Sequence, residues 1–196
     1  MIPAIILAAG ESRRMGTLKP LLRIGNKNFL QHIVGELNNA GISRIYIVVG
    51  HQAERVIAQS GVSNAVFVLN DNYQRGQFSS LQTGIRQLDA KSEAVLVCLG
   101  DQPQIKAEWI RSLIAAFRSA EPLIVVPKYR GKRGHPVLYS EKLFSEILTM
   151  APTQTAHLLT ANHPDEIVEV EMDTRGVLLD ADEPTDLDEL RGYFSE

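Results

Sequence analysis

Three basic side chains lie close to two glycines, directly after a short apolar run near the start of the chain. These residues are Gly10, Arg13, Arg14, Gly16 and Lys19. Glycines let backbone amides approach a ligand closely, and nearby cations favour a polyphosphate. The spacing fits neither a Walker A loop nor the dinucleotide motif G-x-G-x-x-G. We expect a phosphate-binding loop of another type; the alternative is an exposed turn with unrelated charges.

An aspartate follows a second apolar run, at residues 93–100. Asp101 comes directly after Gly100 and shortly before Pro103. A carboxylate at the end of a buried strand is well placed to bind a hard cation such as Mg²⁺, which prefers carboxylate and phosphate oxygens. The residues alone leave two interpretations open, a metal ligand and an aspartate that caps the next helix.

Three further polar groups have both a structural and a functional interpretation. Ser79 and Ser80 stand where a helix is expected to start, and serines often cap helices. A basic stretch at residues 128–133 precedes His135 and is typical of a solvated loop. The acidic stretch at residues 180–190 would complement the dipole of a final helix.

Apolar runs alternate with amphipathic segments along most of the chain. Strands are expected at 44–50, 65–70, 93–100 and 122–127, and helices at 29–41, 79–89 and 107–120. Beyond residue 127 we expect a basic loop, helices near 140–149 and 153–162, strands at 166–171 and 176–180, and a last helix beginning near Pro184. This alternation predicts a three-layer α/β/α fold with a mainly parallel sheet, formed by a single domain over residues 1–196.

The composition restricts the possible partners. The chain of 196 residues is 44% hydrophobic and has a net charge of −3, which gives no overall attraction to nucleic acid. Cys98 is the only cysteine, which suits a reducing compartment. The first apolar run is short and no basic segment precedes it, unlike a secretory signal, and no apolar run is long enough for a membrane helix. We expect a cytoplasmic protein without nucleic-acid or membrane partners.

The stretch LAAGESRRMGTLKPLL, residues 7–22, resembles the L-A-[AG]-G-x-S-x-R-M-G signature, followed by Lys, of nucleotidyltransferases that activate sugars, lipid precursors and molybdopterin. The resemblance continues in order through residues 70–84, 99–103, 131–139 and 178–190. It is closest to the MobA-like group, and within it to the molybdenum cofactor cytidylyltransferases. Ala9 matches the cytidylyl branch, whereas the guanylyl branch usually has glycine there.

The resemblance implies a Rossmann-like fold of the nucleotide-diphospho-sugar transferase type and a Mg²⁺-dependent reaction. An acceptor phosphate would attack the α-phosphorus of a nucleoside triphosphate, preferably CTP, and pyrophosphate would leave. The implied catalytic residues are Arg14, Lys19 and Asp101. The implied metal ligands are Asp101 and Asp182, and the residues implied to border the acceptor are Gly134 and His135. The implied nucleotide-binding residues are Leu7, Ala8, Ala9, Gly10, Ser12, Arg14, Met15, Gly16, Lys19, Ser79, Ser80, Gly100 and Asp101.

One segment departs from the family pattern. The cofactor cytidylyltransferases usually have G-D-x-G-A-R after the basic loop, whereas residues 151–159 read APTQTAHLL. The resemblance implies a molybdopterin-type acceptor, and this departure leaves its identity open. The alternatives are a GTP-using enzyme, a sugar-1-phosphate nucleotidyltransferase, and a non-enzymatic factor that delivers a molybdenum cofactor to a molybdo-oxidoreductase.

Overall fold

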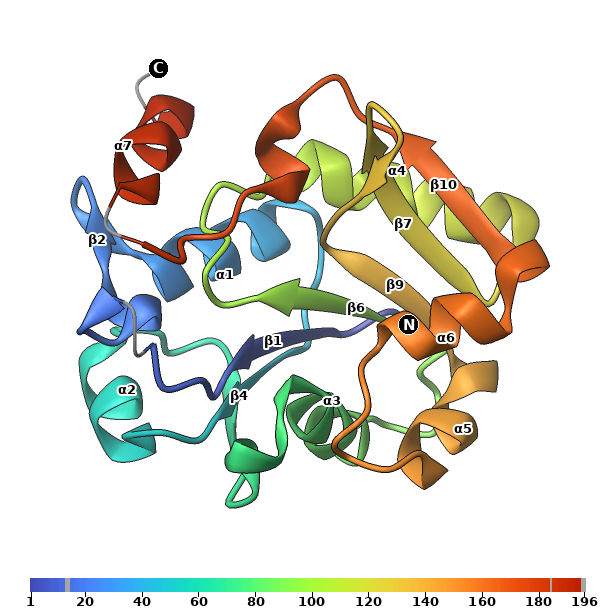
Figure 1. Cartoon of the computed structure of the whole chain (residues 1–196), viewed down its shortest axis with the longest axis horizontal. Helices are drawn as coiled ribbons and strands as arrows, with labels where there is room; N and C mark the ends of the chain where they lie inside the picture. Colours follow the sequence, from blue (N-terminus) through green and yellow to red (C-terminus); the bar gives the residue numbers. More distant parts are fainter. Residues whose placement is uncertain (13–14, 184, 195–196) are drawn as a thin grey trace.

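A computed structural model describes residues 1–12, 15–183 and 185–194, and in this part of the chain eight strands form one mixed sheet (Figure 1). The strands are β1 (Ala4–Ala8), β4 (Ile45–Val49), β5 (Val66–Leu69), β6 (Ala94–Leu99), β7 (Ile124–Tyr129), β8 (Lys132–Arg133), β9 (Val137–Ser140) and β10 (Ile167–Glu171). Their order is β10-β7-β9-β6-β1-β4-β5, and β8 pairs with β7. The pairs β6–β1, β1–β4, β4–β5 and β7–β10 are parallel, whereas β9 runs antiparallel to both of its neighbours.

The central strands are apolar throughout because helices cover both faces of the sheet. Along β1, Ala4 and Ile6 point into one core cluster and Ile5 into the other. The first cluster packs against α1 (Phe29–Asn39), α2 (Ala53–Gln59) and α4 (Ala107–Ala120). The second packs against α3 (Gln77–Ile85), α5 (Phe144–Thr149) and α6 (His157–Asn162). The predicted three-layer α/β fold is therefore confirmed.

A small third cluster joins the two ends of the chain. The hairpin of β2 (Arg23–Ile24) and β3 (Lys27–Asn28) contributes Ile24, and the last helix, α7 (Asp186–Arg191), contributes Leu190. Figure 1 shows α7 beside this hairpin, away from the centre of the sheet. The predicted final helix is thus present, while Pro184, expected near its start, lies outside the described residues.

The structure corrects the predictions for the second half of the chain. The strand expected at 176–180 is wrong, because Arg175–Leu178 form a 3-10 helix, η6, in which the Thr174 hydroxyl accepts the Gly176 N–H at 3.1 Å. The helix expected at 153–162 is shorter, since α6 begins at His157. Strand β9 was not predicted; it lies between β6 and β7 and makes the sheet mixed.

Candidate active site

The order in which strands are added to the sheet changes direction at β1, and this leaves a crevice at the edge of the sheet. From β1 it adds β4 and then β5 on one side, and afterwards β6 on the other. In parallel α/β sheets, ligands bind beyond the carboxyl ends of strands at such a point. The loop that begins at Gly10 and the turn that carries Asp101 both start there. The fold therefore brings together the two strongest sequence features.

Gly100 explains how these two segments approach each other so closely. Its N–H donates to the Leu7 carbonyl at 2.9 Å. A Cβ atom at this position would lie 3.0 Å from the same carbonyl oxygen and 3.1 Å from the Ala8 Cβ. A larger residue would push Asp101 away from the end of β1.

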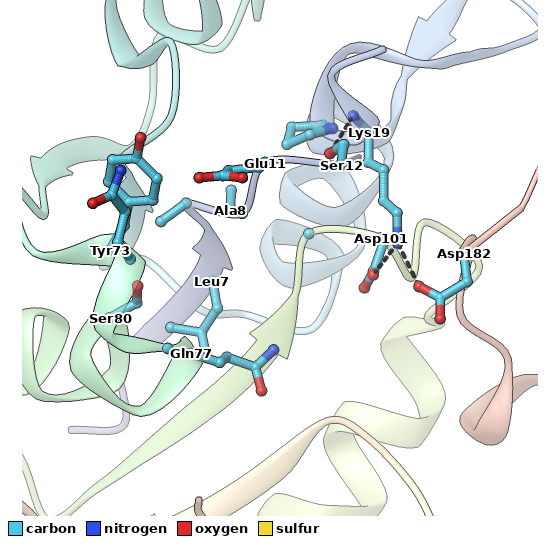
Figure 2. A pocket seen from close by; sticks show the side chains of 16 residues that line it. Leu7, Ala8, Glu11, Ser12, Lys19, Tyr73, Gln77, Ser80, Asp101 and Asp182 are labelled. Carbon is cyan, nitrogen blue, oxygen red and sulfur yellow. Dashed lines mark hydrogen bonds and ion pairs between the residues drawn. The ribbon is translucent and has the colours of Figure 1, made fainter. Parts of the chain in front are cut away.

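A cavity of about 770 Å³ opens at this edge of the sheet (Figure 2). Its lining residues are Leu7, Ala8, Ala9, Gly10, Glu11, Ser12, Lys19, Pro20, Tyr73, Gln74, Gly76, Gln77, Ser80, Gly100, Asp101 and Asp182. This volume lies within the range of small-molecule and cofactor pockets. The main nucleotide segments expected from the sequence thus share one cavity.

Lys19 joins the two expected metal ligands. Its Nζ lies 3.1 Å from Asp101 Oδ2 and 2.6 Å from Asp182 Oδ1, as the dashed lines in Figure 2 show. Burial by itself lowers the pKa of Lys19, but the hydrogen bonds and charges of Asp182 and Asp101 outweigh it and raise the pKa above its usual value. Lys19 is therefore a cation at neutral pH.

Local backbone contacts hold Lys19 in this place. Ser12 has a left-handed backbone (φ 53°), and its hydroxyl accepts the Lys19 N–H at 3.2 Å. Lys19 then begins the 3-10 helix η2 (Lys19–Leu21), with Pro20 in its first turn. The loop between these residues carries Met15 and Gly16, which are not among the lining residues; Arg14 lies outside the described residues.

Asp182 reaches the cavity from the far end of the chain. The N–H of Ala181 donates to the Asp101 carbonyl at 3.1 Å, which places the two aspartates side by side. Asp186 caps the turn by accepting the N–H groups of Asp182 and Glu183 at 2.8 and 2.7 Å. Asp186 therefore has the expected structural role at the helix start, while Asp182 faces Lys19.

The two carboxylates fit a divalent cation. In the described residues no three His, Cys, Asp or Glu side chains form a group able to hold a metal. Yet Asp101 and Asp182, which are far apart in the sequence, converge on one cationic nitrogen, the Nζ of Lys19. Mg²⁺ is commonly bound by one or two carboxylates together with substrate phosphates. The helix-cap alternative for Asp101 is wrong, because Lys106 occupies the N-cap of α4.

The other wall of the cavity is the start of α3. Gly76 is its N-cap residue, so the expectation that Ser79 and Ser80 cap the helix is wrong. Both serines are buried; Ser80 is one of the lining residues, whereas Ser79 is not and donates to the carbonyl of Gly76 at 2.7 Å. Asn70 donates to both serine hydroxyls at 3.0 Å and so fixes this wall.

Four lining residues of this wall, Tyr73, Gln74, Gly76 and Gln77, are not among the residues expected from the sequence, although they lie in the stretch that carries the resemblance. Tyr73 and Gln77 both line the cavity, and Figure 2 shows Gln77 next to Leu7. Gly50 makes room for Tyr73, since a Cβ at Gly50 would lie 2.6 Å from the Tyr73 Cβ. A glycine directly after a strand was the available signal.

The two expected acceptor residues lie beside this cavity and are not part of its lining. The N–H of His135 donates to the Val177 carbonyl at 2.9 Å. A Cβ at Gly134 would lie 2.1 Å from the same oxygen, so only glycine fits there. Burial lowers the pKa of the His135 imidazole below its usual value, and the charge of Asp101 offsets this only in part.

Among the described residues, no helix is long and apolar enough to cross a membrane.

Comparison with known proteins places these features in a family. The model of the MobA-like NTP transferase domain matches residues 4–167. The bifunctional protein GlmU of an Exiguobacterium strain is 34% identical over 125 residues, which are 63% of this chain and 27% of that protein. The matched part thus spans about a quarter of the length of this relative.

Solved structures share the fold over nearly the whole chain. Rv0371c from Mycobacterium tuberculosis superimposes with a TM-score of 0.84 at 26% identity and covers 97% of each chain. A complex of Rv0371c with manganese gives 0.81 at 23% identity, with the same coverage. A nucleotidyl transferase from Methanothermobacter gives 0.85 at 22% identity and covers 99% of this chain and 97% of its own.

Proposed function

We propose a function from the premise that this chain belongs to the MobA-like NTP transferase family. The protein transfers a nucleoside monophosphate from a nucleoside triphosphate, preferably CTP, to a phosphorylated acceptor of the molybdopterin type, and releases pyrophosphate. The observation that carries the proposal is the convergence of Lys19, Asp101 and Asp182 in the cavity at the end of β1.

The nucleotide would bind with its base against residues 7–10 and the start of α3. The carbonyl oxygens of Leu7 and Ala9 already accept the N–H groups of Gly100 and His51, at 2.9 and 3.1 Å. This backbone is rigid and presents fixed dipoles to the base. Ala9 lines the cavity and is 5% exposed as a residue. Its methyl group would take space that a purine needs.

The triphosphate would lie toward Lys19. Backbone amides between Ser12 and Gly16 together with Arg14 would hold the β- and γ-phosphates, and Lys19 would neutralise the α-phosphate. Positioning of this kind and compensation of charge dominate catalysis of phosphoryl transfer. A phosphate oxygen of the acceptor forms the new bond to the α-phosphorus while the bond to pyrophosphate breaks. The attacking oxygen is already anionic, so no side-chain base is required.

Asp101 and Asp182 would hold Mg²⁺ in the proposed site. The cation would stabilise the charge on the phosphates and on the leaving pyrophosphate. Lys19 now contacts both carboxylates, and the third hydrogen of its ammonium group would donate to the α-phosphate when substrate binds. The manganese complex of the similar mycobacterial protein supports a divalent cation in this fold.

The acceptor would enter beside Gly134 and His135. The side chain of His135 is close enough to Asp101 for the carboxylate charge to act on it. Residues 151–159 form a loop and the start of α6, and they do not carry the family's usual G-D-x-G-A-R pattern. The family resemblance makes an acceptor related to molybdopterin our first choice, and the departure at residues 151–159 makes a sugar 1-phosphate the second.

The test is a matrix of nucleotides and acceptors. The purified protein is mixed with Mg²⁺, with CTP or GTP, and with molybdopterin or a panel of sugar 1-phosphates, and pyrophosphate is measured. We expect the highest rate with CTP and molybdopterin. Binding of molybdopterin without pyrophosphate release would favour the alternative, a maturation factor for a molybdo-oxidoreductase.

A further inference from the structure

We propose that Gln104, assisted by Gln102, is a positioning residue that fixes Asp182 relative to Asp101 and thereby sets the affinity of the site for a divalent cation. The inference rests on the proposed function, because it concerns the same pair of carboxylates. Neither glutamine lines the cavity. Their effect would be transmitted through the segment that carries Asp182.

The segment from Gly176 to Asp182 is fastened to residues 101–104 by hydrogen bonds. The Nε2 of Gln104, which is 0% exposed, donates to the carbonyl oxygens of Gly176 and Leu179, both at 2.8 Å. The Nε2 of Gln102 donates to Asp180 Oδ1 at 2.7 Å. Both glutamines lie within three residues of Asp101, so the same stretch of chain carries one carboxylate and holds the segment of the other.

Other contacts also hold this segment: the Val177 carbonyl accepts the His135 N–H at 2.9 Å, and Val177 and Ala181 are fully buried. Beyond η6, which ends at Leu178, residues 179–183 form no helix or strand. The segment's backbone contact with the site is the bond from the Ala181 N–H to the Asp101 carbonyl, at 3.1 Å. The side chain of Asp182 is 39% exposed, so its position depends on the backbone that carries it. The buried amide of Gln104 therefore anchors the segment at its two carbonyls.

Cation binding is sensitive to small errors in this geometry. Mg²⁺ requires near-octahedral coordination with short metal–oxygen distances. Loss of groups that orient metal ligands typically weakens metal affinity by about 10–100-fold. Without the Gln104 amide, the carbonyls of Gly176 and Leu179 would lose these hydrogen bonds. The backbone that carries Asp182 would then change its position.

A matched control exists elsewhere in the fold. Gln82 is also buried, at 3% exposure, and its Nε2 donates to the carbonyls of Ile147 and Met150 at 2.7 and 2.8 Å. It ties α3 to α5 instead of the Asp182 segment. Gln104→Met and Gln82→Met each remove one amide and two hydrogen bonds while nearly preserving side-chain volume. Their losses in thermal stability should therefore be similar.

The experiment measures Mn²⁺ binding by titration calorimetry in the presence of CTP and without an acceptor. We expect Gln104→Met to weaken Mn²⁺ binding by about 10–100-fold and Gln82→Met to leave it within about twofold of the native value. With saturating metal, kcat of Gln104→Met should return close to the native value, because the defect lies in metal affinity. Gln102→Met removes one hydrogen bond, to Asp180, and should weaken Mn²⁺ binding by less. This variant replaces Gln104→Met in the experiment if Gln104→Met does not fold.

Two results would overturn the inference while the proposed function stands. These are native Mn²⁺ affinity in both Gln104→Met and Gln102→Met, and equal weakening in Gln104→Met and Gln82→Met. If the native protein binds no Mn²⁺ with CTP or GTP, the metal assignment fails and takes this inference with it. The chain's single tryptophan gives a second readout, because the Trp109 ring packs against Gly176. Its emission should change in Gln104→Met and remain native in Gln82→Met.

Discussion

Replacement of Lys19 by methionine should change metal binding and turnover in opposite directions. In the nucleotide-free protein the Lys19 ammonium stands between Asp101 and Asp182, where a divalent cation would compete with it. Methionine keeps most of the side-chain volume and removes the charge. Both carboxylates then lose their contact with the ammonium, which would otherwise compete with the metal, while the α-phosphate loses its neutralising partner.

The size of the effect on metal binding follows from the two contacts. Hydrogen bonds to charged groups contribute about 1.5–3 kcal/mol each when they are shielded from water. The contact with Asp101, at 3.1 Å between side chains that are 14% and 24% exposed, keeps part of this value. Asp182 is 39% exposed, so the shorter contact is close to a surface ion pair, which is worth about 0–1 kcal/mol. A total of about 1–2 kcal/mol corresponds to roughly 5–30-fold tighter binding of the metal.

The assay pairs calorimetry with kinetics. Mn²⁺ is titrated into nucleotide-free native protein and into Lys19→Met, and turnover is then measured with CTP and acceptor. We expect the increase in affinity above, together with a loss in turnover of about 10²–10³, the usual cost of removing one preorganised transition-state contact. Lys106→Met is the control for net charge, because the Lys106 ammonium donates to the Tyr193 carbonyl at 3.2 Å and does not contact these carboxylates.

The reasoning would be refuted if Lys19→Met bound Mn²⁺ with native or weaker affinity while Lys106→Met behaved as the native protein. Lys19 would then not compete with the cation. If triphosphate affinity collapsed and turnover at saturation stayed native, Lys19 would be a binding group only.

Three further outcomes are expected. Asp101→Asn should abolish metal-dependent turnover and leave the melting temperature nearly native, because the side chains have the same shape and lie at the rim of the sheet; full activity would discard Asp101 as a metal ligand. Ala9→Gly should improve kcat/KM for GTP relative to CTP, within the roughly 10–200-fold range of steric exclusion, and an unchanged ratio would show that Ala9 does not select the base. Burial raises the pKa of the Cys98 thiol to about 12, so it should react with a disulfide reagent at pH 8 only as the protein unfolds; fast labelling of the native protein would contradict its burial.

The fold was largely predictable because its main strands are buried on both faces. Runs such as residues 44–50 must be apolar throughout in a covered parallel sheet, so they stand out in the sequence. Strand β9 escaped prediction because it is short and follows a basic, exposed stretch. The apolar residues at 176–180 predict a strand, which the structure does not contain. The carbonyls at 176 and 179 instead accept from Gln104, which the sequence does not distinguish from a surface glutamine.

The site was predictable only in its parts. Asp101 and the loop from Gly10 could be recognised because each follows a strand, and strand ends meet at one edge of a parallel sheet. The ion pairs of Lys19 could not be predicted, since they depend on how the segment of Ala181 and Asp182 packs against the turn that follows β6. Tyr73 and Gln77 are ordinary loop and helix residues in the sequence, and their place in the cavity follows from the path of the chain after β5.

The most direct test follows the α-phosphate. CTP labelled at its α-phosphate is incubated with Mg²⁺, molybdopterin, and either the native protein or Asp101→Asn. The account predicts that the native protein moves the label into the acceptor with one pyrophosphate released per transfer, and that Asp101→Asn does neither. Binding of CTP and molybdopterin by the native protein, with the label remaining in CTP and no pyrophosphate formed, would contradict nucleotidyl transfer to this acceptor.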